Sequence, residues 1–242
     1  AIGCTEPIAV ALCVAKATET LGAKPEKIDV LLSANILKNA MGVGIPGTGM
    51  IGLPIAIALG ALIGKSEYQL EVLKDSNPAA VEEGKRFIGE KRIDISLKKN
   101  ITEKLYIEVC CKSGGNKATA IIAGGHTTFI YIARNGDVLL NKQSAGCGEE
   151  EAQVAGLTLR KVYDFAMNAP LDEIRFILET ARLNKAAAER SFDGNYGHGL
   201  GRMLRGNYEH KILGDSVFSH ILSYTSGACD ARMAGAMIPV MS

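Results

Sequence analysis

Residues 93–141 read IDISLKKNITEKLYIEVCCKSGGNKATAIIAGGHTTFIYIARNGDVLLN, and this stretch sets the fold class. Apolar and polar residues alternate in four short runs, which are 93–97, 105–109, 118–122 and 129–133. Strict alternation is typical of strands with one buried face. The turn-forming pairs and clusters SGGN, GG and NG separate the runs and introduce a last one at 138–140. The stretch therefore predicts a small antiparallel sheet of four or five strands.

The sequence on both sides of this sheet predicts helices. Residues 5–21 are apolar nearly all round and end at Gly22, which indicates a buried helix. Further helices are expected at 34–41, 53–62 and 78–90, and from Glu149 onward with breaks at 168–170, at 193–201 and at Gly214. Residues 28–33 fit either a strand or the start of a helix.

The order of these elements predicts an α+β fold. We expect a mainly helical domain, formed by residues 1–77 and 149–242, with an inserted small antiparallel-sheet α+β module at 78–148. The chain begins without Met and stops inside an apolar stretch. We therefore expect it to be part of a longer protein, truncated at its C-terminus.

Composition narrows the function classes. The 242 residues carry a net charge of only +1, which gives no support for binding to nucleic acid or to an anionic membrane. Six cysteines in a chain of this length are not a disulfide framework, and no signal peptide is visible, so we expect a cytoplasmic protein. The charge-free span between Lys38 and Lys65 raises the question of a membrane helix, but glycines and prolines break its first half. A core helix behind a glycine-rich loop is the better interpretation.

A cysteine stands at the predicted start of the first helix, in residues 3–7 (GCTEP). Thr5, Glu6 and Pro7 are typical of a first helical turn. Free N–H groups and the helix dipole at such a position favour a thiolate, which can bind a metal or act as a nucleophile. The alternative is an ordinary buried cysteine beside a helix cap.

The loop at residues 42–49 (GVGIPGTG) matches the spacing G-x-G-x-x-G. The match alone is weak evidence for a dinucleotide, because no clear second parallel strand follows. The backbone N–H groups around Gly47 and the hydroxyl of Thr48 could instead hold a small anion such as a substrate carboxylate. Close helix packing through glycine is an equally good interpretation.

A second cysteine, Cys229, lies in a similar setting within residues 226–232 (SGACDAR), which we interpret as a small-residue turn before a helix. Two such cysteines far apart in the sequence suit a cluster or metal held between helices. Neither belongs to a C-x-x-C pair, so spacing alone does not assign a metal. Cys147 is a reserve ligand, whereas Cys13, Cys110 and Cys111 are expected in the core.

Polar residues near these segments are candidates for binding or catalysis. His126 follows two glycines at a strand edge, and His198 lies in a glycine-rich loop that could face a cleft. Asn35, Lys38 and Asn39 come just before the glycine loop and could reach a ligand there.

Together, residues 3–7, the segment 35–49, His126-Thr127-Thr128 and residues 226–230 resemble the L-cysteine desulfidase family, which is similar to the α chain of iron–sulfur-dependent L-serine dehydratases. The resemblance implies a [4Fe-4S] enzyme without pyridoxal phosphate, in which three cysteines hold the cluster and one iron stays open to the substrate. It matches Cys4 and Cys229 to cluster ligands and places the third cysteine beyond Ser242.

The implied reaction is β-elimination from a small amino acid, most simply L-cysteine to pyruvate, ammonia and hydrogen sulfide. L-serine deamination is the alternative, and a third reading is a non-catalytic binding relative that has lost the cluster. The base is open among Glu6, Lys38, His126 and His198. Candidates for holding the substrate are Thr5, Glu6, Asn35, Asn39, Gly47, Thr48, Thr225 and Ser226. The Ala- and Gly-rich helices are compatible with a homo-oligomer.

Overall fold

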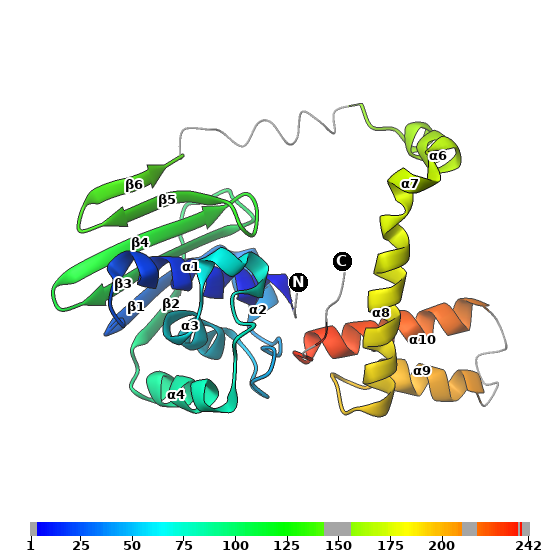
Figure 1. Ribbon diagram of the computed structural model, residues 1–242, viewed down its shortest axis with the longest axis horizontal. Coiled ribbons are helices and arrows are strands. Elements are labelled where there is room, and N and C mark those ends of the chain that lie inside the picture. The colour runs from blue at the N-terminus through cyan, green and yellow to red at the C-terminus, as the bar shows by residue number, and fades with distance from the viewer. Residues whose placement is uncertain (1–3, 143–155, 210–216, 237, 239–242) are drawn as a thin grey trace.

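Six strands form one sheet in the order β2-β1-β3-β4-β5-β6, and helices lie against one of its faces (Figure 1). The computed structural model describes residues 4–142, 156–209, 217–236 and 238. The strands are β1 (Lys27–Leu32), β2 (Ile93–Leu97), β3 (Tyr106–Ser113), β4 (Asn116–Ala123), β5 (Phe129–Arg134) and β6 (Asp137–Asn141). The helices are α1 (Thr5–Leu21), α2 (Ala34–Ala40), α3 (Leu53–Leu62), the 3-10 helix η1 (Ser66–Glu71), α4 (Pro78–Gly89), α6 (Leu159–Asn168), α7 (Leu171–Ile174), α8 (Phe176–Asp193), α9 (Leu200–Glu209) and α10 (Val217–Met233).

The α+β prediction is confirmed, and the four alternating runs and the last run at 138–140 all form strands. The sheet has one strand more than expected, because residues 27–32 form β1 between β2 and β3. β1 pairs parallel with β2 and antiparallel with β3, while the remaining pairs are antiparallel. The division into three segments remains a prediction, although the sheet draws its strands from two of them.

One face of the sheet is buried under α1. Alternate residues of neighbouring strands meet on this face, as in the pairs Val30↔Val109 and Val109↔Ala120, and all three side chains are at most 1% exposed. The opposite face carries charge: Asp29 and Lys112 form an ion pair of 2.6 Å across β1 and β3. The alternation of apolar and polar residues along each strand therefore gives the sheet one buried face and one exposed face.

Helix α1 is buried along most of its length because both of its sides are covered. One side packs on β3 and β4, and the other side packs on α3. The backbones of α1 and α3 approach so closely at Gly60 that a Cβ there would lie 2.6 Å from the carbonyl oxygen of Ala11. A helix without a polar face is expected only in such a position.

The cysteines fit this layering. Cys13 on α1 is fully buried, and its Sγ lies 3.3 Å from the carbonyl oxygen of Ala120. Cys111 faces α1, whereas Cys110 is half-buried on the open face, as expected of neighbours in a strand. All five described cysteines are free thiols.

The C-terminal helices form a second packed unit. α10 packs on α8 and α9, around a small core of Ala187, Ala231 and Ala236. The predicted breaks at 168–170 and 193–201 are confirmed, and the one at Gly214 lies outside the described residues. Within the described ranges, no helix is both long and apolar enough to cross a bilayer.

The two units meet where the glycine loop contacts the end of α10. The N–H of Gly44 donates to the carbonyl oxygen of Met233 at 2.7 Å. A Cβ on Gly44 would lie 2.3 Å from the backbone of Ala234, so only glycine permits this approach. The glycines of this loop therefore allow close backbone packing, although it is a loop and not a helix that packs on α10.

We predict that Gly60→Ala lowers the free energy of unfolding by about 1–3 kcal/mol, because the added methyl must push α1 away from α3. The matched control is Gly89→Ala, at the exposed end of α4, where a Cβ meets no atom within 4 Å. There the better helix propensity of alanine should raise stability by up to about 1 kcal/mol. Urea denaturation followed by circular dichroism measures both; equal effects at the two sites would contradict the close crossing.

Candidate functional site

A cleft of about 440 Å³, here called the Cys4 cleft, opens where α1, α2, the glycine loop and α10 come together. It is lined by Cys4, Glu6, Lys38, Asn39, Gly42, Val43, Arg232 and Met233. The structure thus joins four of the predicted site residues from the N-terminal segments with the distant C-terminal end of α10. A thiol, a carboxylate, an amide and two cations share this small space.

Cys4 is the N-cap residue of α1, as the sequence predicted, and it is only 7% exposed. Its Sγ donates a hydrogen bond to Oε2 of Glu6 at 3.1 Å. Burial, this hydrogen bond and the charge of Glu6 raise the pKa of the Cys4 thiol to about 11, although a backbone N–H and Arg232 act in the opposite direction. The expected thiolate is therefore wrong for the metal-free protein, because burial and the neighbouring carboxylate outweigh the helix start. A metal at this sulfur would have to displace the proton.

Glu6 is held in its charged form. Burial alone would raise the pKa of its carboxyl, but hydrogen bonds from Cys4, from backbone N–H and from Asn39, together with the positive charge of nearby His126, lower it overall. The Asn39 amide donates to Oε1 at 3.2 Å. Glu6 thus offers the cleft a fixed negative charge whose two oxygens are oriented by neighbours on both sides.

Arg232 is the site residue that sequence reasoning missed. It lies in the last turn of α10, is half-buried, and its Nε is buried with no hydrogen-bond partner among the described residues. A buried polar atom without a partner calls for an explanation, and a bound anion would supply one. The signal in the sequence was the position of Arg232 three residues after Cys229, at the end of segment 226–232.

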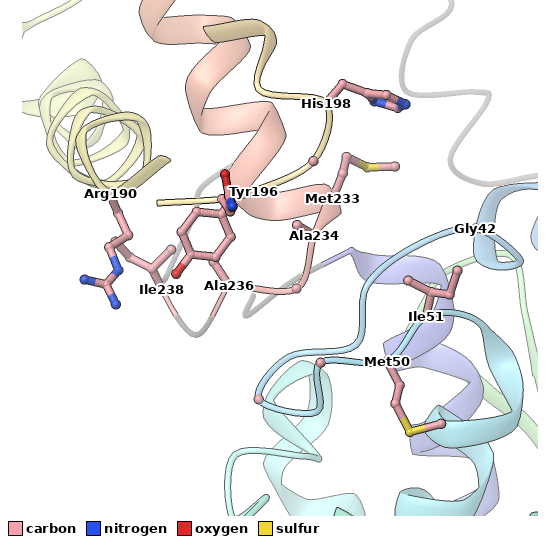
Figure 2. Close-up of a pocket in the computed structure, with 15 residues that line it drawn as sticks. Gly42, Met50, Ile51, Arg190, Tyr196, His198, Met233, Ala234, Ala236 and Ile238 are labelled. Atoms are coloured by element: carbon pink, nitrogen blue, oxygen red, sulfur yellow. The ribbon is translucent and has the colours of Figure 1, made fainter. Parts of the chain in front are cut away.

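A second cleft of about 780 Å³, here called the His198 cleft, adjoins the first and shares Gly42 and Met233 with it. Figure 2 shows Met50 and Ile51, which directly follow the glycine loop, on one side and Tyr196 and the end of α10 on the other. Gly47 and His198 both line this cleft, and the side chain of His198 is exposed.

Asp230 positions the chain beside His198. Its buried carboxylate accepts hydrogen bonds from the N–H of His198 at 3.2 Å and of Gly201 at 2.9 Å. It thereby ties the connection before α9 to α10 and caps the first turn of α9. This role was not predicted from the sequence.

The glycine loop uses most of its polar groups on itself. Thr48 donates from Oγ1 to the carbonyl oxygen of Ile45 at 2.7 Å and accepts from the N–H of Met50. The N–H groups of Gly44, Ile45, Thr48 and Gly52 also have backbone partners. Thr48 is not among the residues that line the His198 cleft. With these groups already paired, the loop is less open to an anion than its sequence suggests.

The interpretation of residues 226–232 as a turn before a helix is wrong. They lie inside α10, so Cys229 is an exposed residue in the middle of a helix. It lines a third cavity of about 840 Å³, here called the Cys229 cavity, together with Thr225, Lys185 and Arg232. The hydroxyl of Thr225 donates to the carbonyl oxygen of Ile221 within the helix.

Cys4 and Cys229 thus line different spaces that share Arg232. In the ranges that the structure describes, no three His, Cys, Asp or Glu side chains are grouped closely enough to hold a metal ion. The described residues alone do not form the ligand set of an iron–sulfur cluster. Cys147 lies outside the described residues, and Thr5, Asn35 and Ser226 line none of the three spaces.

The fold and these clefts define a class: an α+β protein with polar clefts, of the size that holds small molecules, at the junction of two packed units. UPF0597 proteins match all of the chain. That of Bacteroides fragilis is 81% identical over 242 residues, that of Bacteroides thetaiotaomicron 78% and that of Chromobacterium violaceum 44% over 243 residues. The chain is therefore similar to UPF0597 proteins along its whole length.

Each of these alignments covers 100% of this chain but 56% of the relative. The chain therefore spans little more than half the length of the curated relatives it matches. No family model and no solved structure matches it.

We predict that alkylation separates the two candidate cysteines. In the metal-free protein at about pH 8, iodoacetamide should modify exposed Cys229 roughly 100-fold faster than Cys4, whose thiol is buried and ionises only near its raised pKa of about 11. The alkylation rate of Cys4 should keep rising at pH values where the rate of an ordinary thiol has become constant. Glu6→Gln should make the alkylation of Cys4 faster, because it removes a negative charge beside the thiol. Peptide mass spectrometry measures both sites; equal rates would contradict the environment described for Cys4.

Proposed function

We propose that this chain carries the amino-acid-binding part of an iron–sulfur-dependent β-eliminating lyase, with L-cysteine as its substrate. The observation that supports this most strongly is the composition of the Cys4 cleft, in which Glu6 faces the same space as Lys38 and Arg232. A free amino acid carries one negative and one positive group on the same carbon atom. The cleft offers both complements within about 440 Å³.

Arg232 is the partner for the substrate's carboxylate. Its guanidinium is permanently charged, and its buried Nε lacks a partner among the described residues. Lys38, exposed at the rim, adds a second positive charge. Glu6 is the partner for the ammonium group, because its carboxylate is kept ionised and is oriented by Asn39.

Two of the four candidate bases, Glu6 and Lys38, line the Cys4 cleft itself. His126 acts on Glu6 as a nearby charge, and His198 lines the adjoining cleft. Removal of the substrate's α-proton needs a basic atom within hydrogen-bond reach. Glu6 and Lys38 are therefore the first residues to test in that role.

The cluster is the part of the proposal that depends on the longer protein. When bound, an iron–sulfur cluster would supply a Lewis-acidic iron to the β-leaving group. Cys4, which lines the same cleft, would be one of its ligands. Further thiols must come from outside the described residues or from a rearrangement around Cys229, consistent with a chain that spans 56% of its relatives.

The alternatives are L-serine deamination and a non-catalytic amino-acid-binding protein. The second is favoured by the separation of Cys4 from Cys229 and by the proton that Cys4 shares with Glu6. Both alternatives keep the same cleft and the same charges, so activity and iron content must be measured together.

The deciding assay uses the full-length protein, purified without oxygen and reconstituted with iron and sulfide. We expect pyruvate from L-cysteine, no activity in Cys4→Ala, and full activity in the matched control Cys110→Ala, whose thiol lies on the open face of the sheet. Bound iron without pyruvate from either amino acid would point to a different substrate. A protein with neither iron nor activity would be the binding relative.

Arg232→Gln should raise KM about 10- to 100-fold, because a buried hydrogen bond to a carboxylate contributes about 1.5–3 kcal/mol. The control is Arg182→Gln, which breaks an exposed ion pair with Glu179 on α8 and should leave the kinetics unchanged. A fall in kcat at constant KM would show that Arg232 does not anchor the substrate.

A further inference from the structure

The helical unit exposes an extensive apolar surface at the end of α8 that is remote from α9 and α10 (Figure 1). This surface is formed by α6, α7 and the first turns of α8, and is here called the apolar arm. Its most exposed large side chains are Leu159 at 86%, Leu171 at 80% and Leu178 at 68%. Neither α6 nor α7 has a single buried residue.

The exposed side chains form a pattern typical of a packed helix. Leu159, Val162 and Tyr163 follow one another at the spacing that places residues on one face of α6. A helix with one apolar face normally buries that face, since most helical stability comes from such packing. On α7 and α8, Leu171, Ile174, Ile177 and Leu178 line a groove of about 470 Å³.

The two units differ sharply in what they bury. The α+β unit has a large continuous core, which includes Leu12, Ile57 and Val109. Among its described residues, the helical unit buries mainly alanines, and Phe192 is its one large buried apolar side chain. Most of its large apolar residues are exposed, the reverse of a complete domain.

We propose that the apolar arm is covered by the part of the full-length protein that lies outside these 242 residues. The chain spans 56% of the UPF0597 proteins it matches, so a protein of their length has a further segment large enough to form a partner layer. The exposed apolar side chains of the arm pack against that segment, and the groove on α7 and α8 receives apolar side chains from it. This inference is independent of the proposed function, because none of the apolar side chains named above lines the Cys4 cleft, the His198 cleft or the Cys229 cavity.

The test uses the full-length protein with Phe176 replaced by the photo-crosslinking residue p-benzoylphenylalanine. Phe176 is 61% exposed at the start of α8, and the replacement keeps an aromatic ring in place. The matched control carries the same residue at Arg182, a polar position on the same helix. Irradiation of a mixture of unlabelled and nitrogen-15-labelled protein, followed by peptide mass spectrometry, identifies the partner and separates links within one chain from links between copies.

We expect Phe176 to link, within one chain, to residues outside the 242, with a yield several-fold above that at Arg182. Links between labelled and unlabelled copies would overturn the proposal and make a second copy the occupant. A yield at Phe176 no higher than at Arg182 would show that the arm faces solvent in the whole protein, which would also overturn it. Circular dichroism of both variants checks that folding is intact.

Discussion

The contact between Gly44 and the end of α10 is the constraint on which the candidate site depends. It joins two units that are far apart in the sequence through a hydrogen bond of 2.7 Å and a backbone approach that leaves no room for a side chain. Both the Cys4 cleft and the His198 cleft have one wall from the loop and another from α10. Without this contact neither cleft would be closed on its second side.

The other wall of the Cys4 cleft is anchored in the most buried part of the molecule. Cys4 and Glu6 stand at the start of α1, and the rest of α1 is fixed between the sheet and α3. A buried thiol and a charged carboxylate therefore lie at the rigid end of a core helix. Such support holds polar groups in place at little cost in conformational entropy when a ligand binds.

The strands were predictable because alternation in the sequence maps directly onto the two faces of a sheet. β1 was ambiguous, since a run of six residues with apolar character fits a strand or a buried helix equally well. Its parallel pairing with β2 joins Ile28 to Ile93, and no local pattern in the sequence reports a contact over that separation. The helix at 5–21 was predicted with its bounds, because its apolar character and its final glycine are both local signals.

The site was predicted less well, for reasons that lie in packing and electrostatics. The small residues at 226–228 suggested a turn, but they let helices cross: a Cβ on Gly201 would lie 2.3 Å from Gly227. The ionisation of Cys4 depends on burial and on the carboxylate of Glu6, which competes with the helix dipole. Arg232 reaches the Cys4 cleft because α10 packs beside the glycine loop, and no local pattern in the sequence indicates that packing.

The order of the strands also has a consequence for synthesis of the protein. α1 comes first in the chain but packs on β3 and β4, so the apolar face beneath it is not complete until Ala123 has been translated. At ordinary elongation rates of about 5–20 residues per second, the interval from α1 to Ala123 lasts roughly 5–20 s. During that time a helix with almost no polar surface has left the ribosome before the strands that cover it. The nascent chain therefore offers chaperones a hydrophobic target whose lifetime is set by the speed of translation.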